Sequence, residues 1–110
     1  MKKKGGKIRV RKKGSYKRTL RLSDTKPEFY FKLINGKSIK NILGLADDLD
    51  KIPDEVLYHH VNPQRNDFSN WLRDIFKQKK LADEISKVQS RLEIQVILLK
   101  FIVKQLKRLR

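Results

Sequence analysis

The chain has 110 residues, 38% of them hydrophobic, no cysteine, and a formal net charge of +16. This length suits one small domain, and the lack of cysteine excludes disulfides and thiolate metal sites. No apolar run reaches the 18 residues of a spanning helix, and no apolar stretch follows the basic N-terminus as in a signal peptide, so a cytoplasmic location is the default expectation.

The positive charge is concentrated at the two ends of the chain. Residues 1 to 22 hold eleven Lys or Arg and no acid, residues 100 to 110 hold five and no acid, and residues 23 to 99 hold twelve charges of each sign. A neutral domain between basic arms indicates a polyanionic partner. The N-terminal arm, residues 1 to 28, has too few apolar residues to offset its ordering entropy, so it is predicted to be largely disordered by itself. A merely solubilising tail is the alternative.

A strand is predicted over 29 to 34, FYFKLI, because the segment is rich in aromatic and β-branched residues. Asn35-Gly36 is a strong tight-turn signal. A weaker alternation in KRTLRLS suggests a second edge strand. After the turn, Ser38 is predicted to cap a helix over 39 to 49 directly, so the unit is expected to be strand, turn, helix.

Four further helices are predicted along the rest of the chain. Pro53 suits the first turn of a helix that ends near His60. Asn66 or Asp67 is placed to cap the next helix, 67 to 77, in which Phe68, Trp71, Leu72, Ile75 and Phe76 fall within about 140° of arc. A short helix with Leu81, Ile85 and Val88 aligned follows. The capping-box sequence Ser90-Arg-Leu-Glu93 then opens the last helix, 91 to 109. The predicted fold is therefore mainly α, a small bundle of about five helices with one or two short N-terminal strands. Residues 29 to 110 are expected to form the single domain.

The last helix carries more apolar surface than one face needs. Its large apolar side chains spread over about 220° of arc, whereas an ordinary surface helix has an apolar stripe of little more than about 100°. Two explanations stay open: the helix is the central element of the bundle, or its second apolar side, within Leu92 to Leu109, pairs with another copy of the chain. Membrane-surface binding is a third, less favoured reading.

Candidate catalytic and metal sites are weak. His59 and His60 are adjacent, so on a helix they point about 100° apart, and a zinc site lacks further ligands. We expect one of them to be packed and hydrogen-bonded and the other exposed. Asp47, Asp48 and Asp50 supply too few regularly spaced oxygens for a calcium loop, so a solvated helix end is expected. No nucleophile elbow or phosphate-binding glycine loop is present in the sequence, and no cofactor or enzymatic activity is expected.

Residues 29 to 91 resemble a family of small, mostly archaeal domains of unknown function. The resemblance rests on a strand that ends in a glycine turn, an HHVN segment, an NDFxxW element and a Leu-Ala pair in the next helix. It implies no activity. The residues that carry it are Gly36, His59, His60, Val61, Asn62, Asn66, Asp67, Phe68, Trp71, Leu81 and Ala82.

The leading functional hypothesis is a non-enzymatic protein that binds the phosphate backbone of RNA or DNA through its basic arms. No recognition helix with residues spaced for base edges is visible, so binding is expected to be largely sequence-independent. Ribosomal or another structured RNA suits such an arm, and Tyr16 is a candidate for stacking on bases. The alternative is a protein-interaction or adaptor module that dimerises through the last helix. The candidate binding residues are Lys2, Lys3, Lys4, Lys7, Arg9, Arg11, Lys12, Lys13, Tyr16, Lys17, Arg18, Arg21, Lys104, Lys107, Arg108 and Arg110.

Overall fold

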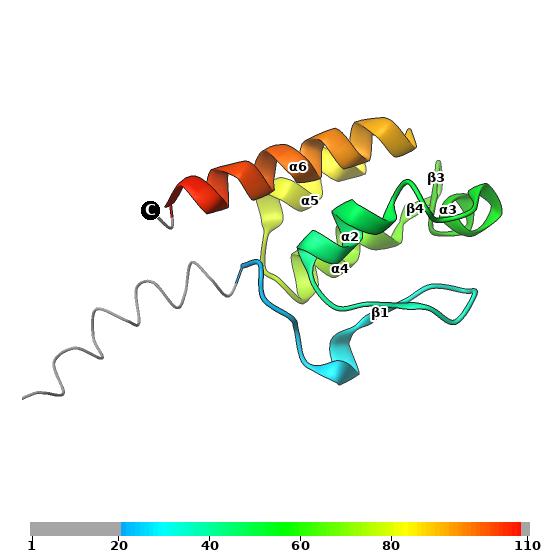
Figure 1. Ribbon diagram of the computed structural model, residues 1–110. Coiled ribbons are helices and arrows are strands. Elements are labelled where there is room, and N and C mark those ends of the chain that lie inside the picture. The colour runs from blue at the N-terminus through cyan, green and yellow to red at the C-terminus, as the bar shows by residue number, and fades with distance from the viewer. Residues whose placement is uncertain (1–20, 109–110) are drawn as a thin grey trace, which may run out of the picture.

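The computed structural model describes residues 21–108, in which five α-helices and two short hairpins surround one apolar core (Figure 1). The mainly helical class predicted from the sequence is confirmed. The elements in chain order are η1 (Pro27–Phe29), β1 (Phe31–Lys32), β2 (Ser38–Ile39), α2 (Ile42–Asp48), α3 (Asp54–His60), β3 (Val61–Asn62), β4 (Arg65–Asn66), α4 (Asp67–Asp74), α5 (Lys79–Ser86) and α6 (Arg91–Arg108).

The Asn35-Gly36 turn joins two antiparallel strands, which corrects the expectation that a helix follows it directly. Gly36 has a φ of 93°, in the left-handed region that favours glycine. The turn reverses the chain so that Ile39 of β2 pairs with Phe31 of β1, and both side chains enter the core. Ser38 therefore lies in β2 and caps nothing. The N-cap of α2 is Asn41, whose Oδ1 accepts a hydrogen bond from the Gly44 N–H at 2.6 Å.

A second hairpin, β3 and β4, connects α3 to α4, and the sequence did not predict it. Val61 pairs with Asn66, and Asn62 pairs with Arg65. Asn66 then caps α4, because its Oδ1 accepts from the Ser69 N–H at 2.9 Å, as one of the two predicted caps requires. This helix ends at Asp74, before the predicted end at residue 77, and Lys77 has a φ of 59°, which is outside the right-handed helical region.

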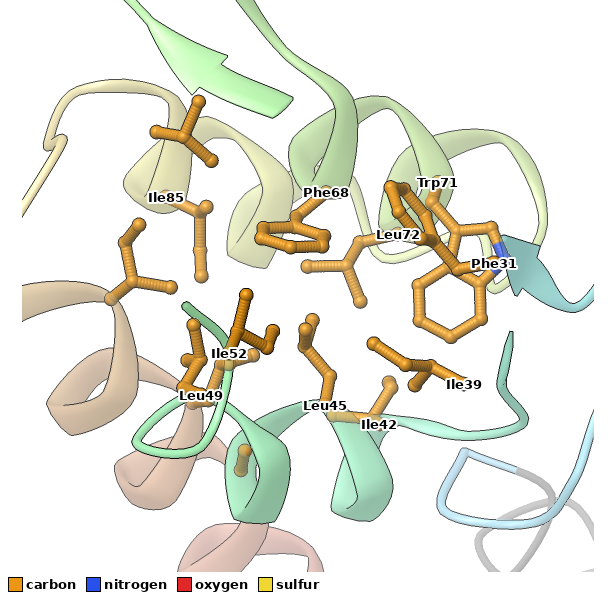
Figure 2. Packing of buried hydrophobic residues seen from close by; sticks show 14 of the residues in the cluster. Phe31, Ile39, Ile42, Leu45, Leu49, Ile52, Phe68, Trp71, Leu72 and Ile85 are labelled. Carbon is orange, nitrogen blue, oxygen red and sulfur yellow. The ribbon is translucent and has the colours of Figure 1, made fainter. Parts of the chain in front are cut away.

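The core lies between the β1–β2 hairpin, α2, α4 and α5, with the side chains of α4 at its centre (Figure 2). Phe68 of α4 is fully buried, and its ring centroid is 4.8 Å from that of Phe31. Trp71 packs edge-on against Phe31 at 5.7 Å and donates its indole N–H to the Phe29 carbonyl at 2.7 Å. The predicted apolar face of this helix is thus the face that organises the core.

The last helix, α6, lies on the outside of the core rather than at its centre. It packs against α2 and α5 (Figure 1). Its buried residues lie on one side and are Ile94, Leu98, Ile102 and Gln105. Of the two explanations for its wide apolar arc, central burial is therefore wrong. Arg91 fixes the start of α6: its guanidinium donates to the carbonyls of Leu49 and Ile52 and contacts the Asp54 carboxylate. Ser90 caps the helix as predicted, since its Oγ accepts from the Glu93 N–H at 3.1 Å.

The folded part begins earlier than the predicted boundary at residue 29. Leu22 is only 8% exposed and belongs to the core, and the Thr25 N–H donates to the Lys40 carbonyl at 2.9 Å. Residues 21 to 28 thus belong to the domain and not to the arm. Leu22 is the one large aliphatic residue of this segment, and its burial attaches the segment to the core.

Candidate nucleic-acid interface

Most of the basic residues proposed for binding lie outside the described part of the chain. These residues are all the candidates from Lys2 to Arg18, which include Tyr16, and Arg110 at the other end. Arg21, Lys104, Lys107 and Arg108 are described. Three of these four meet at one place.

That place is a cleft of about 630 Å³ between α5 and α6, here called the basic cleft. Its rim is strongly positive, and its floor is apolar, formed by Leu81, Val88, Ile97 and Phe101. Glu84 is the one acid among the described residues that line it. Six cations line it: Arg21, Lys80, Lys87, Lys100, Lys104 and Arg108.

Helical spacing explains how α6 supplies half of these cations. Lys100, Lys104 and Arg108 are four residues apart, so they stack along one side of the helix. Lys107 is set off from this stripe and does not line the cleft. Like charges at this spacing repel one another. An anion bound beside the stripe would reduce this repulsion, and Glu84 alone cannot balance the six cations of the cleft.

On the facing side, α5 begins with Lys79 and Lys80 and has no acid in its first turn. Positive charge at a helix N-terminus opposes the helix dipole, so this placement is locally unfavourable. Departures of this kind from local preference are expected at functional sites. Sequence reasoning assigned no role to Lys80 or Lys87. The sequence does not reveal that the segment carrying these two lysines lies next to α6.

Arg21 connects the cleft to the basic N-terminal sequence. Its guanidinium donates to Oε1 of Gln105 at 3.3 Å, and Gln105 is a polar residue buried on the inner side of α6. The described chain therefore starts at the C-terminal part of α6, as Figure 1 also shows. Ten further Lys or Arg residues precede Arg21 in the sequence, so the strongly basic part of the sequence ends at a residue that lines the basic cleft.

Several signature residues form a separate group with Ser69, where α3, the β3–β4 hairpin and α4 meet. This group is here called the polar corner and consists of His60, Asn66, Asp67, Ser69 and Trp71. His60 is 4% exposed and His59 is exposed, as predicted for the pair. The Ile34 N–H donates to Nε2 of His60 at 3.2 Å, so the neutral ring carries its hydrogen on Nδ1. That Nδ1–H lies 2.8 Å from Oδ2 of Asp67 and donates to it.

Other members of the polar corner are bonded to the protein itself in the same way. The Asn66 side chain donates to the Ile85 carbonyl at 3.2 Å, and the Ser69 hydroxyl donates to the Ala82 carbonyl at 2.7 Å. Asn62, just outside the corner, donates to the Tyr58 carbonyl at the end of α3. These contacts join α3, α4 and α5 to one another. The arrangement orients backbone segments, and Nε2 of His60 is already used by Ile34 and faces no open space.

Two other kinds of site, a metal site and a membrane-spanning helix, are absent from the described residues. Within residues 21–108, no group of three or more His, Cys, Asp or Glu side chains is arranged to hold a metal ion. The acids at the end of α2 are at the surface, where Asp47 pairs with Lys51 at 3.5 Å. Over the same residues, no helix is long and apolar enough to cross a bilayer.

Comparison with known proteins returns no match to a family model, to a curated protein or to a solved structure. Membership of the HHVN–NDFxxW family thus stays a proposal that rests on the signature residues alone.

Proposed function

We propose that this protein binds the phosphate backbone of nucleic acid, with the basic cleft and the N-terminal arm as one continuous site. The observation that carries the proposal is the basic cleft itself, where six cations and one acid surround an apolar floor and Arg21 joins the arm to it. Paired cations on a single protein surface attract a polyanion and release its counterions. A positively charged groove can follow the backbone of a single strand.

The apolar floor favours single-stranded RNA over duplex. Phe101 is half-buried at the floor, between the Lys100–Lys104 side of α6 and α5. An aromatic ring beside a row of cations is the arrangement on which exposed bases stack while phosphates meet the charges. Recognition of this kind is sequence-tolerant, because every base has a face to stack.

The test is a fluorescence-anisotropy titration of a labelled single-stranded RNA and a duplex DNA at several salt concentrations. If about eight phosphates are contacted, the slope of log affinity against log salt should be near −6 to −7 for the full chain. The triple variant Lys100→Gln/Lys104→Gln/Arg108→Gln should reduce the magnitude of this slope by about 2–3. The matched control is Lys26→Gln/Lys32→Gln/Lys37→Gln, which removes the same charge from exposed positions outside the cleft.

Equal losses in the two triple variants would mean that only net charge matters and would overturn the cleft as the site. Deleting residues 1–20 separates the contribution of the arm. This deletion removes ten cations and leaves Arg21 and the core residue Leu22 in place. A deletion extending to residue 25 would also remove Leu22 and would confuse binding with folding.

Self-association through α6 is the second candidate function, as an interaction module of the proposed family. A specific observation favours it: one side of α6 exposes a row of large aliphatic residues.

A further inference from the structure

The side of α6 that faces solvent carries an apolar row, here called the outer ridge. Its members are 40–68% exposed, although each is a large aliphatic side chain. They lie within about 80° of arc at 100° per residue, and the centre of this arc is about 125° from that of the buried side of the helix. The outer ridge consists of Leu92, Val96, Leu99, Val103 and Leu106.

The spacing along the outer ridge is 4, 3, 4, 3, which is the heptad repeat of a coiled coil. Leucine occupies every d position and valine every a position. Apolar residues at both a and d form the seam through which two helices pack in a coiled coil. The ridge is also widened on one flank, where exposed Leu43 of α2 lines a hollow of about 420 Å³ with Leu99 and Ile102. This combination fits a second helix with the same pattern.

Charge selects the direction of that second helix. The half of α6 from Lys100 onward carries four cations and no acid, whereas the half before it carries one Arg and one Glu. A parallel pair would place the two basic halves, and the two Arg21 side chains bonded to them, side by side. An antiparallel pair sets each basic half against the less basic half of its partner, so repulsion is smaller.

Charge also selects the register. When Val96 packs against the partner's Leu99 and Leu92 packs against the partner's Val103, Glu93 flanks the seam opposite the partner's Lys100. The twofold axis repeats this contact, so the dimer gains two reciprocal Glu–Lys pairs. Sliding by one heptad would instead bring Lys100 opposite the partner's Lys100.

We propose that the outer ridge binds a second copy of this chain as an antiparallel two-helix pair centred between Ile97 and Leu98. The inference rests on the second candidate function and fixes its geometry. Lys100 flanks the outer ridge and also lines the basic cleft, while Gln95 flanks the other edge and donates to the Ala46 carbonyl of α2 at 2.8 Å. Because the twofold axis runs perpendicular to the plane of the two helices, both basic clefts open on the same face of the dimer.

The first test is sedimentation equilibrium of the full chain over a wide range of concentration. We expect a monomer–dimer equilibrium that Leu99→Glu weakens at least tenfold. Ile34→Glu is the matched control, since Ile34 is 53% exposed in the β1–β2 turn and the change introduces the same charge outside α6. Trp71 fluorescence reports that both variants fold. A full chain that stays monomeric, or one that is monomeric and floats with anionic vesicles through Leu99, would overturn self-association.

The second test addresses the register alone. The chain has no cysteine, so Leu92→Cys and Val103→Cys each introduce one thiol. In the proposed register neither variant forms a disulfide-linked dimer by itself, and mixing the two under mild oxidation links them. Dimers that link within either variant alone would overturn the antiparallel register while leaving self-association standing.

Charge reversal gives an independent measure of the same contact. Glu93→Lys and Lys100→Glu should each weaken dimerisation several-fold, and the double variant should restore it because the pair is only exchanged. If the double variant dimerised more weakly than either single variant, the Glu93–Lys100 contact would be overturned.

Discussion

The polar corner and the outer surface of α6 differ in how far their side chains are buried and bonded to the rest of the protein. In the polar corner, His60 and Ser69 are buried and bonded to other parts of the chain, and Phe68 beside them is fully buried. On α6, large aliphatic side chains are exposed and the cations of the basic cleft outnumber its one acid. The residues of the most distinctive sequence motif therefore hold the fold together, whereas the exposed apolar and basic side chains lie on the helix outside that motif.

The largest expected difference between the two regions concerns apolar truncation. Phe68→Ala should lower the free energy of unfolding by about 3–5 kcal/mol, because the ring is fully buried against Phe31 and its loss leaves a cavity. Leu106→Ala on the outer ridge, where the side chain is 51% exposed, should lower it by less than about 1 kcal/mol. Urea denaturation followed by Trp71 fluorescence, at the lowest usable protein concentration, measures both. Similar losses would remove the distinction.

The two adjacent histidines sharpen the comparison within a single dipeptide. His60→Ala should lower the free energy of unfolding by about 2–4 kcal/mol, since it leaves the Ile34 N–H without its acceptor and opens a cavity beside Phe31 and Phe68. His59→Ala removes an exposed contact with Arg65 and should change stability by no more than about 0.5 kcal/mol. The same denaturation experiment compares them. A larger effect at His59 would contradict a structural role for His60.

The smallest expected effect concerns two serine hydroxyls that make bonds of the same length. Ser69 donates to the Ala82 carbonyl at 2.7 Å in the core, and Ser86 donates to the Asp83 carbonyl at 2.7 Å at the surface. Ser69→Ala should lower the free energy of unfolding by about 1–2 kcal/mol, because the buried Ala82 carbonyl loses its side-chain donor. Ser86→Ala should change it by less than about 0.5 kcal/mol, since water replaces the hydroxyl. Thermal unfolding by circular dichroism ranks the two, and equal shifts would show that burial does not decide the value of the bond.

Local patterns predicted much of the fold. The apolar spacing in α4, the asparagine before it and the serine before α6 each act within one helical turn, so the sequence reveals them directly. The two hairpins were missed for a common reason. Ser38 looked like a cap and no pattern marked β3 and β4, because strands that are only two residues long leave almost no periodic signal.

The candidate site was harder to predict, because it depends on which helices meet. The arms were recognised by composition, but the basic cleft joins Arg21, Lys80 and Lys104, which are separated by dozens of residues. The excess apolar arc of α6 was visible, whereas the side that the domain covers was not. Only the packing of Ile94, Leu98 and Ile102 against α2 and α5 separates the buried side from the outer ridge.

The contact between Arg21 and Gln105 has a consequence for how the fold responds to ionic strength. It brings the start of the folded chain to the most basic stretch of α6, so charges that are distant in sequence repel one another across a short distance. Salt screens this repulsion, and it also screens attraction to phosphate. Higher ionic strength should therefore stabilise the free protein while it weakens the proposed complex. If the protein binds nucleic acid as proposed, the bound strand should supply the counter-charge at low ionic strength and raise the melting temperature.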